Sequence, residues 1–218
     1  MIQYLLFDFD GTLFDTGPGV MRCVQYAVEK LGKPALDETT LRRFVGPPLD
    51  ESFIEFCGLS PEGAREAIRL YRERYQPTGI WECEPYPGMP ELLDELKAAG
   101  FRIAVCTSKP TAMAVRILER YGMVDRFDFI CGSELDGTRS KKHEVVQACL
   151  EHFGVTDTDT VRMIGDRKYD ILGAGKCGVQ TIGVAFGYAE PGELEEHGVA
   201  FIAASAAELA QYILHINA

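Results

Sequence analysis

Apolar residues recur with two different spacings along the chain, and the change of spacing divides it into parts. Residues 4–7 form a short continuous apolar run that is typical of a strand covered on both faces, and Gly11 and Thr12 end it. Between residues 18 and 75 the apolar positions instead follow a helical spacing. The helices predicted there cover residues 18–30, 37–45, 50–57 and 61–75.

From Met89 onward, helical and strand patterns alternate. The predicted strands cover residues 101–106, 127–131, 160–164, 181–184 and 200–202, and the predicted helices cover 90–99, 111–121, 144–153, 169–177 and a segment that begins at 205. Such alternation is typical of an α/β fold with a Rossmann-like parallel sheet, helices on both faces, and sites at the carboxyl ends of the strands. We therefore predict an α/β core of residues 1–15 and 86–218 and an inserted all-helical domain of residues 16–85.

Net charge and composition exclude several classes of binding partner. The formal net charge of −11 at pH 7 argues against binding to nucleic acid or to anionic membrane surfaces. No apolar run approaches the ~20 residues of a membrane span, and the first residues lack the basic region of a signal peptide. The seven cysteines include no Cys-x-x-Cys pair, so free thiols in a reducing cytoplasm are expected. The expected partner is a small molecule, and the sequence indicates no oligomeric state.

Two carboxylates follow the first predicted strand. Side chains alternate along an extended segment, so Asp8 and Asp10 project to the same side while Phe7 and Phe9 pack on the other. Two carboxylates at such short range repel each other. Either a bound divalent cation offsets this repulsion, or one carboxylate has a raised pKa and is protonated. The alternative is a pair of solvated loop aspartates, which are common in short turns.

Three further polar segments follow or open predicted elements. Thr107-Ser108-Lys109 follows the second core strand and offers hydroxyls and backbone amides to phosphate oxygens, although its hydroxyls could equally cap a helix. Asp166 and Asp170 open the helix after residue 164, where acids also complement the helix dipole. Lys142, next to Lys141, opens another helix, where cations are unfavourable, and such a locally broken rule indicates function.

Oxygen donors with a fixed ammonium form a site for a hard cation. Asp8, Asp10 and Asp166 suit Mg²⁺, which prefers a few carboxylates, several waters and a substrate phosphate. Phosphoryl transfer is the matching chemistry, because metal and lysine spread the charge of the transferring group while a carboxylate attacks phosphorus.

These motifs also resemble those of a known family. Asp8-Phe9-Asp10-Gly11-Thr12-Leu13, Thr107-Ser108, Lys142 and Gly165-Asp166-x-x-x-Asp170, in that order, resemble the haloacid dehalogenase (HAD) superfamily of phosphohydrolases over the whole chain. The helical domain looks like the inserted cap of its phosphoglycolate phosphatase-like branch.

The resemblance implies a role for each matching residue. Asp8 would be the nucleophile, and Asp10 would protonate the leaving oxygen and then activate water. Asp8, the backbone carbonyl of Asp10, and Asp166 would bind magnesium, and Asp170 would support the metal or orient Lys142. The residues that would hold the phosphoryl group are Gly11, Thr107 and Ser108.

The sequence departs from the common pattern of the family at two positions. Ser108 stands where asparagine is frequent, and Lys142 is followed by His143 rather than by proline. The second departure opens a choice between Lys141 and Lys142 as the catalytic lysine. Counting back from Leu150 favours Lys142.

The implied activity is magnesium-dependent hydrolysis of a phosphate monoester through an aspartyl-phosphate, with a phosphoglycolate-like substrate favoured. A nucleoside monophosphate, inorganic pyrophosphate, sugar phosphomutase activity and a non-enzymatic phosphate-accepting domain are the alternatives. Asp10 argues against dehalogenation, because halide release needs no acid there.

Specificity is expected to come from the helical domain. Arg43, Gly46 and Pro47 are predicted to face the substrate, since a rigid turn beside a fork-shaped cation suits an anionic or planar leaving group. Alternatively, Arg42 and Arg43 form a solvated helix face.

Overall fold

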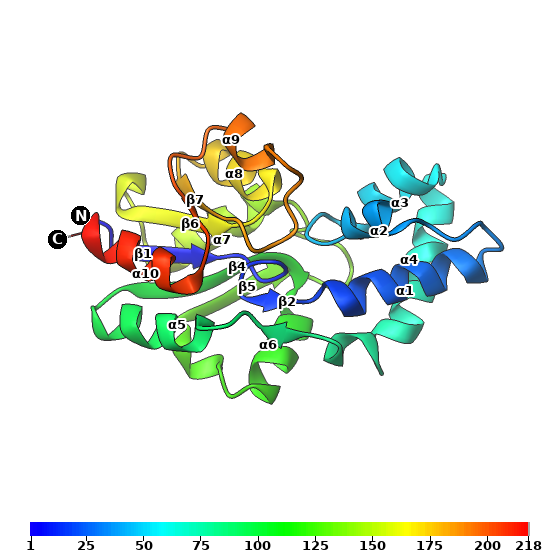
Figure 1. Cartoon of the computed structure of the whole chain (residues 1–218), viewed down its shortest axis with the longest axis horizontal. Coiled ribbons are helices and arrows are strands. Elements are labelled where there is room, and N and C mark those ends of the chain that lie inside the picture. Colours follow the sequence, from blue (N-terminus) through cyan, green and yellow to red (C-terminus); the bar gives the residue numbers. More distant parts are fainter. Residues whose placement is uncertain (218) are drawn as a thin grey trace. The chain divides into compact units, whose positions relative to one another are not determined.

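The structure, a computed structural model, describes residues 1–217, and the chain divides into two compact units. The first unit consists of Met1–Phe14 together with the chain from Pro85 onward, and the second is Asp15–Glu84. At the two points where the chain passes between them, the short strands β2 (Phe14–Asp15) and β3 (Glu84–Pro85) form a two-stranded sheet (Figure 1).

The first unit is built on a six-stranded parallel sheet in the order β5-β4-β1-β6-β7-β8. This confirms the α/β fold with a Rossmann-like sheet. The strands are β1 (Tyr4–Phe7), β4 (Arg102–Pro110), β5 (Phe129–Ser133), β6 (Val161–Gly165), β7 (Gln180–Val184) and β8 (Ile202–Ala203).

Strand register places three strand ends side by side. Phe7, the last residue of β1, lies opposite Val105 of β4 and Ile164 of β6. The residues that follow these three positions, Asp8, Cys106-Thr107 and Gly165-Asp166, therefore meet at one edge of the sheet.

Helices cover both faces of this sheet, and apolar side chains of the strands and helices form the core between them. The helices of the first unit are α5 (Met89–Ala98), α6 (Thr111–Arg120), α7 (Lys142–Phe153), α8 (Lys168–Lys176), α9 (Glu193–Glu196) and α10 (Ala206–His215), with short 3₁₀ helices η2 (Val124–Arg126) and η3 (Thr158–Thr160). Leu6, Ala104 and Met163 share one apolar core with α7 and α8, while α5 and α10 pack against each other. Leu5 and Phe7, the alternate side chains of β1, are also fully buried, which explains its continuous apolar run.

The second unit is helical. Its elements are α1 (Gly17–Lys30), α2 (Glu38–Arg42), α3 (Leu49–Cys57), α4 (Pro61–Tyr75) and the 3₁₀ helix η1 (Gly79–Trp81). Ser60 caps α4 by accepting a hydrogen bond from the backbone N–H of Gly63, and Pro61 occupies the first turn, as the sequence predicts. No helix among the described residues is both long enough and apolar enough to span a bilayer.

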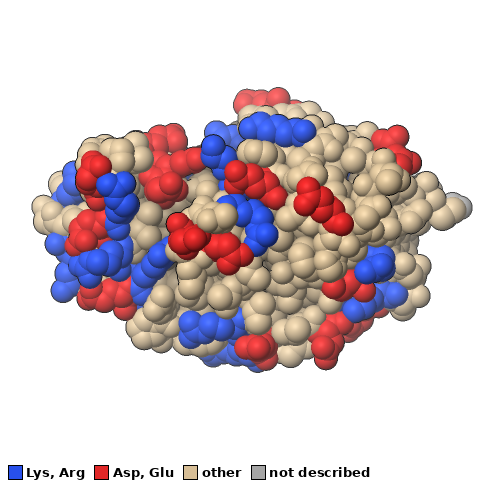
Figure 2. Space-filling view, turned by 180° about the vertical axis from the view of Figure 1, so that it is seen from behind, with Lys and Arg blue, Asp and Glu red and all other residues tan. Residues whose placement is uncertain are grey.

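Charges of both signs are interspersed on the face of the molecule seen in Figure 2. Along α4, Arg65 pairs with Glu62 and Arg69 with Glu66, each at 2.8 Å. No continuous basic surface is present on the face shown.

Several predicted boundaries differ from the structure for identifiable reasons. β4 extends through Pro110 instead of ending at Cys106, because its pairing with β5 shifts register between these residues and the polar segment stays extended. The predicted 37–45 helix covers only Glu38–Arg42, and the chain then turns toward Gly46, whose φ of 108° is not helical. The predicted strand 127–131 begins only at Phe129, after a 3₁₀ turn. The sequence patterns did not indicate α9, β2 or β3.

Candidate active site

A tight loop at the end of β1 presents the two carboxylates. The backbone N–H of Asp8 donates to Ile164 O at 2.9 Å, which extends the ladder with β6 by one residue. The chain then turns at Gly11, whose φ of 81° is in the left-handed region. Phe9 stacks on Phe14, with ring centroids 4.8 Å apart. Asp8 and Asp10 are both buried, so the solvated-loop alternative does not describe them.

A buried lysine contacts the first of these carboxylates. Lys142 Nζ lies 2.7 Å from Asp8 Oδ1 and 2.8 Å from Asp170 Oδ1, and it donates to Cys106 O at 3.2 Å. Burial opposes its charge, but Asp170 and Asp8 outweigh burial and raise the pKa of Lys142, so it is an ammonium. Lys141 is exposed. Of the two candidate lysines, the structure therefore places Lys142 beside Asp8.

Three buried carboxylates form a cluster beside this lysine. Single oxygens of Asp8, Asp166 and Asp170 lie within 4.8 Å of one another. Burial raises the pKa of Asp8 to about 7, against the opposing attraction of Lys142. Burial also raises the pKa of Asp166 well above its usual value, with Asp170 and Asp8 adding to the effect. A metal-free site therefore resists full ionisation of its carboxylates.

The donor set fits a hard divalent cation. All three side chains offer oxygen, and one ammonium does not balance three carboxylates. Apart from Lys142, the contacted oxygens Asp8 Oδ1 and Asp170 Oδ1 have no hydrogen-bond partner among the described residues. The carboxylate of Asp10 is not in the cluster, which leaves its backbone carbonyl as the predicted ligand.

Two hydrogen bonds and two closely packed glycines hold the Asp166 side chain in place. Tyr188 N donates to its Oδ2 at 2.7 Å, and Thr12 Oγ1 donates to its Oδ1 at 3.2 Å. Gly11 and Gly187 approach it so closely that a Cβ on either would meet an Asp166 atom at 2.1 or 2.4 Å. Only glycine fits these two positions without moving Asp166.

The predicted phosphate-binding residues lie on β4 at the same sheet edge. Thr107 is buried, and its Oγ1 accepts a hydrogen bond from Lys109 N at 3.2 Å. Ser108 is half-buried, and its carbonyl accepts from Ser133 Oγ at 2.8 Å. Their role in holding a phosphoryl group, like that of Gly11, stays a prediction.

A second buried lysine contacts Asp10, and sequence reasoning missed this contact. Lys109 Nζ lies 2.8 Å from Asp10 Oδ1, and the Lys109 side chain is only 5% exposed. The one available signal was its position after two hydroxyl residues at a strand end. Its partner is 99 residues away in the sequence, so local pattern could not reveal the pair.

A buried ion pair supports the loop after β7 and was also missed. Arg167 Nε lies 2.9 Å from Glu193 Oε1, and Lys168 N donates to the same oxygen at 2.8 Å. Glu193 thus ties α9 to the start of α8, directly after Asp166. The segment between β7 and α9 contains Tyr188, whose N–H holds Asp166.

The predicted specificity residues lie in the second unit. Arg43 pairs with Glu55 at 3.2 Å, and its guanidinium lies 4.0 Å from the centre of the Phe56 ring. Gly46 has a φ of 108°, and Pro47 is buried just before α3. Whether these residues contact substrate stays a prediction.

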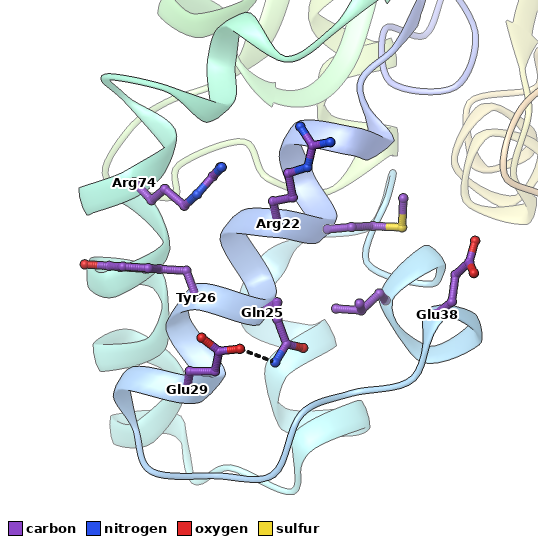
Figure 3. Close-up of a pocket in the computed structure, with 8 residues that line it drawn as sticks. Arg22, Gln25, Tyr26, Glu29, Glu38 and Arg74 are labelled. Atoms are coloured by element: carbon purple, nitrogen blue, oxygen red, sulfur yellow. Dashed lines mark hydrogen bonds between the residues drawn. The ribbon is translucent and has the colours of Figure 1, made fainter.

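The second unit also contains a hollow of about 480 Å³ (Figure 3). Its cations Arg22 and Arg74 both pair with Glu82, at 2.9 and 2.8 Å. Gln25 donates to Glu29 at 2.9 Å (Figure 3). These polar groups are already engaged with one another. The residues that line the hollow are Met21, Arg22, Gln25, Tyr26, Glu29, Glu38, Leu41 and Arg74.

Comparison with protein families gives one match that spans most of the chain. A family model described as haloacid dehalogenase-like hydrolase matches residues 5–184. This range includes the aspartates at the end of β1, Lys142 and both aspartates after β6.

Individual proteins of different printed activities are similar to the chain. It is 40% identical over 209 residues to a 5'-nucleotidase of Pseudomonas aeruginosa, which covers 96% of this chain and 94% of that protein. It is 36% identical to the tyrosine-protein kinase PtkA of Mycobacterium tuberculosis, over 85% of this chain but only 63% of that protein. It is 29% identical to a phosphoglycolate phosphatase of Vibrio parahaemolyticus, over 97% and 96% of the two chains.

A solved structure matches the whole fold. The crystal structure of a predicted phosphatase from Clostridium acetobutylicum superposes with a TM-score of 0.95 at 40% identity, covering 99% of each chain. Residues that lie far apart in the sequence thus meet at one sheet edge of a fold shared with that protein.

Proposed function

Because the chain belongs to the haloacid dehalogenase-like hydrolase family, we propose that it is a magnesium-dependent phosphatase of small phosphate monoesters. The observation that carries this proposal is the pairing of each carboxylate after β1 with its own buried ammonium. Asp8 contacts Lys142 at 2.7 Å, and Asp10 contacts Lys109 at 2.8 Å. Asp166 and Asp170 complete an oxygen site beside Asp8.

In the first half-reaction, a carboxylate oxygen of Asp8 attacks phosphorus. The bond between phosphorus and the ester oxygen breaks, its electron pair goes to that oxygen, and Asp10 gives the oxygen a proton. The products are the free alcohol and an aspartyl-phosphate on Asp8. Lys142, an ammonium in the folded protein, offsets the negative charge that collects around Asp8.

In the second half-reaction, Asp10 takes a proton from water as the water oxygen bonds to phosphorus. The bond from phosphorus to Asp8 breaks, which releases inorganic phosphate and regenerates the Asp8 carboxylate. Asp10 is again protonated for the next substrate, so protons balance over the cycle.

Asp8, Asp166 and the backbone carbonyl of Asp10 would hold the metal, with Asp170 in support. A bound Mg²⁺ would supply charge stabilisation to the phosphoryl oxygens and offset the carboxylates that burial disfavours. Thr107 and Ser108 would hold the remaining phosphoryl oxygens from the end of β4.

The substrate class we propose to test first is the 5'-nucleotides. The similarity to the 5'-nucleotidase is higher than that to the phosphoglycolate phosphatase, at 40% against 29% identity. Phosphoglycolate is the second candidate, because similarity to that phosphatase covers 97% of the chain. The helical unit is proposed to serve as the cap that makes this choice through Arg43, Gly46 and Pro47.

The test is phosphate release from a panel of 5'-nucleotides, phosphoglycolate, pyrophosphate and sugar phosphates, with Mg²⁺ and with chelator. The account predicts Mg²⁺-dependent turnover concentrated on one ester and lost in Asp8→Asn, which keeps the shape of the side chain. Phosphate transfer back to a sugar phosphate would instead indicate a mutase. No turnover of any ester by folded protein would favour a phosphate-accepting binding domain.

A further inference from the structure

Lys109 is a buried lysine that contacts Asp10, but the two half-reactions described above assign it no step. It lies on the irregular end of β4, where pairing with β5 shifts register between Cys106 and Pro110. Such irregularities redirect side chains at the edges of sheets. Lys109 Nζ lies 5.7 Å from the centre of the Phe9 ring and 2.8 Å from Asp10 Oδ1.

The simpler interpretation is that Lys109 only forms a buried ion pair that stabilises the fold. The identity of its partner, Asp10, indicates a further role. A lysine that is 5% exposed must pair with an acid to remain charged. The acid it pairs with is the group that has to exchange a proton with the leaving oxygen and then with water. Asp10 is the more exposed partner, with 12% of its side chain accessible.

We propose that Lys109 is a positioning residue that fixes which oxygen of Asp10 carries the catalytic proton. This inference rests on the proposed phosphatase function. Oδ1 of Asp10 accepts from the ammonium of Lys109, so the proton that passes to the leaving oxygen is carried by Oδ2. The last side-chain torsion of an aspartate is broad, and the contact with Lys109 limits it.

The proton transfers remain balanced under this assignment. Asp10 Oδ2 gives its proton to the ester oxygen as the phosphorus–oxygen bond breaks, and it receives a proton from water in the second half-reaction. Lys109 takes no part in either proton transfer. Its contribution is the direction in which Oδ2 points.

This role predicts a dependence on the leaving group. An alkyl or ribosyl ester needs protonation of its leaving oxygen, whereas p-nitrophenolate departs as a stable anion. A donor misplaced by about 1 Å can lower a rate by roughly 100-fold. Lys109→Met should therefore lower kcat for an alkyl phosphate at least about tenfold more than kcat for p-nitrophenyl phosphate.

The experiment measures kcat and KM for both esters in wild type, Lys109→Met, Lys109→Arg and Asp10→Asn, and in the Asp10→Asn/Lys109→Met double variant. Lys109→Arg should recover part of the selective loss, because a guanidinium can also hold Oδ1. In the Asp10→Asn background, removing Lys109 should cause no further selective loss. The control is Lys176→Met at an exposed lysine on α8, which should leave both rates unchanged.

Failure of this inference is distinguishable from failure of the proposed function. Equal losses on the two esters in Lys109→Met, or selective losses that multiply in the double variant, would overturn the role of Lys109. Wild type that hydrolyses neither ester, or Asp8→Asn that hydrolyses both, would overturn the proposed function itself. If Lys109→Met does not fold, Lys109→Gln, which also removes the charge, is judged by the same criterion.

Discussion

The carboxylate of Asp8, the proposed nucleophile, should destabilise the metal-free protein at neutral pH. Burial raises its pKa from 3.8 to about 7, even though Lys142 opposes the change. The folded state therefore holds this proton more tightly than the unfolded chain does. Its contribution to stability is fully present below about pH 4 and is lost as the pH rises through 7.

The size of this effect follows from the two pKa values. A difference of about 3 pH units, at about 1.4 kcal/mol per unit, corresponds to about 4 kcal/mol in the free energy of unfolding. About 2.5 kcal/mol of this falls between pH 5 and pH 8. The amide in Asp8→Asn does not ionise, so the variant should not show this fall in the free energy of unfolding. Asp166 titrates in the same sense in both proteins, and Lys142 remains charged throughout the range.

The assay is urea unfolding in the presence of chelator at pH 5 and pH 8, for wild type and Asp8→Asn. We expect wild type to lose about 2.5 kcal/mol more than the variant between the two pH values. Added Mg²⁺ at pH 8 should then stabilise wild type more than the variant, which lacks one proposed ligand. Asp159→Asn, at an exposed aspartate, serves as the control. Equal pH dependence in wild type and Asp8→Asn would refute the reasoning.

Three further substitutions test other parts of the account. Lys142→Met leaves the buried carboxylates of Asp8 and Asp170 without their ammonium. It should abolish phosphate release and lower the free energy of unfolding at pH 8 by about 3 kcal/mol. An unchanged urea midpoint would contradict this. Gly187→Ala places a Cβ 2.4 Å from Asp166 and should displace this proposed ligand, so calorimetry should show Mg²⁺ affinity reduced at least about tenfold. The control Gly175→Ala, whose Cβ would meet nothing within 4 Å, should bind Mg²⁺ as wild type does. Arg43→Ala should raise KM or lower kcat for the true substrate, and unchanged kinetics would exclude it from specificity.

Local pattern predicted those parts of the molecule that depend on neighbouring residues. The continuous apolar run of β1 and the Ser60-Pro61 start of α4 were readable because burial on both faces and helix capping are set within a few residues. Boundaries that depend on strand pairing, such as the end of β4 at Pro110, were not readable.

The candidate site divides in the same way. The aspartates and Lys142 were identified because their motifs have recognisable order and spacing. Lys109 with Asp10, and Arg167 with Glu193, were not identified, since each pair joins separate elements and neither has a local signature. The approach of Gly187 to Asp166 likewise exists only after folding.

The measurement that tests the central claim most directly is chemical trapping of the acyl phosphate on Asp8. Enzyme turning over its best ester with Mg²⁺ is quenched in borohydride, which reduces an aspartyl-phosphate to homoserine, and the peptide that contains Asp8 is analysed by mass spectrometry. The account predicts homoserine at position 8, only when both ester and Mg²⁺ are present, and not at Asp10 or Asp166. Rapid turnover with an unmodified Asp8 peptide, or trapping at another aspartate, would contradict it.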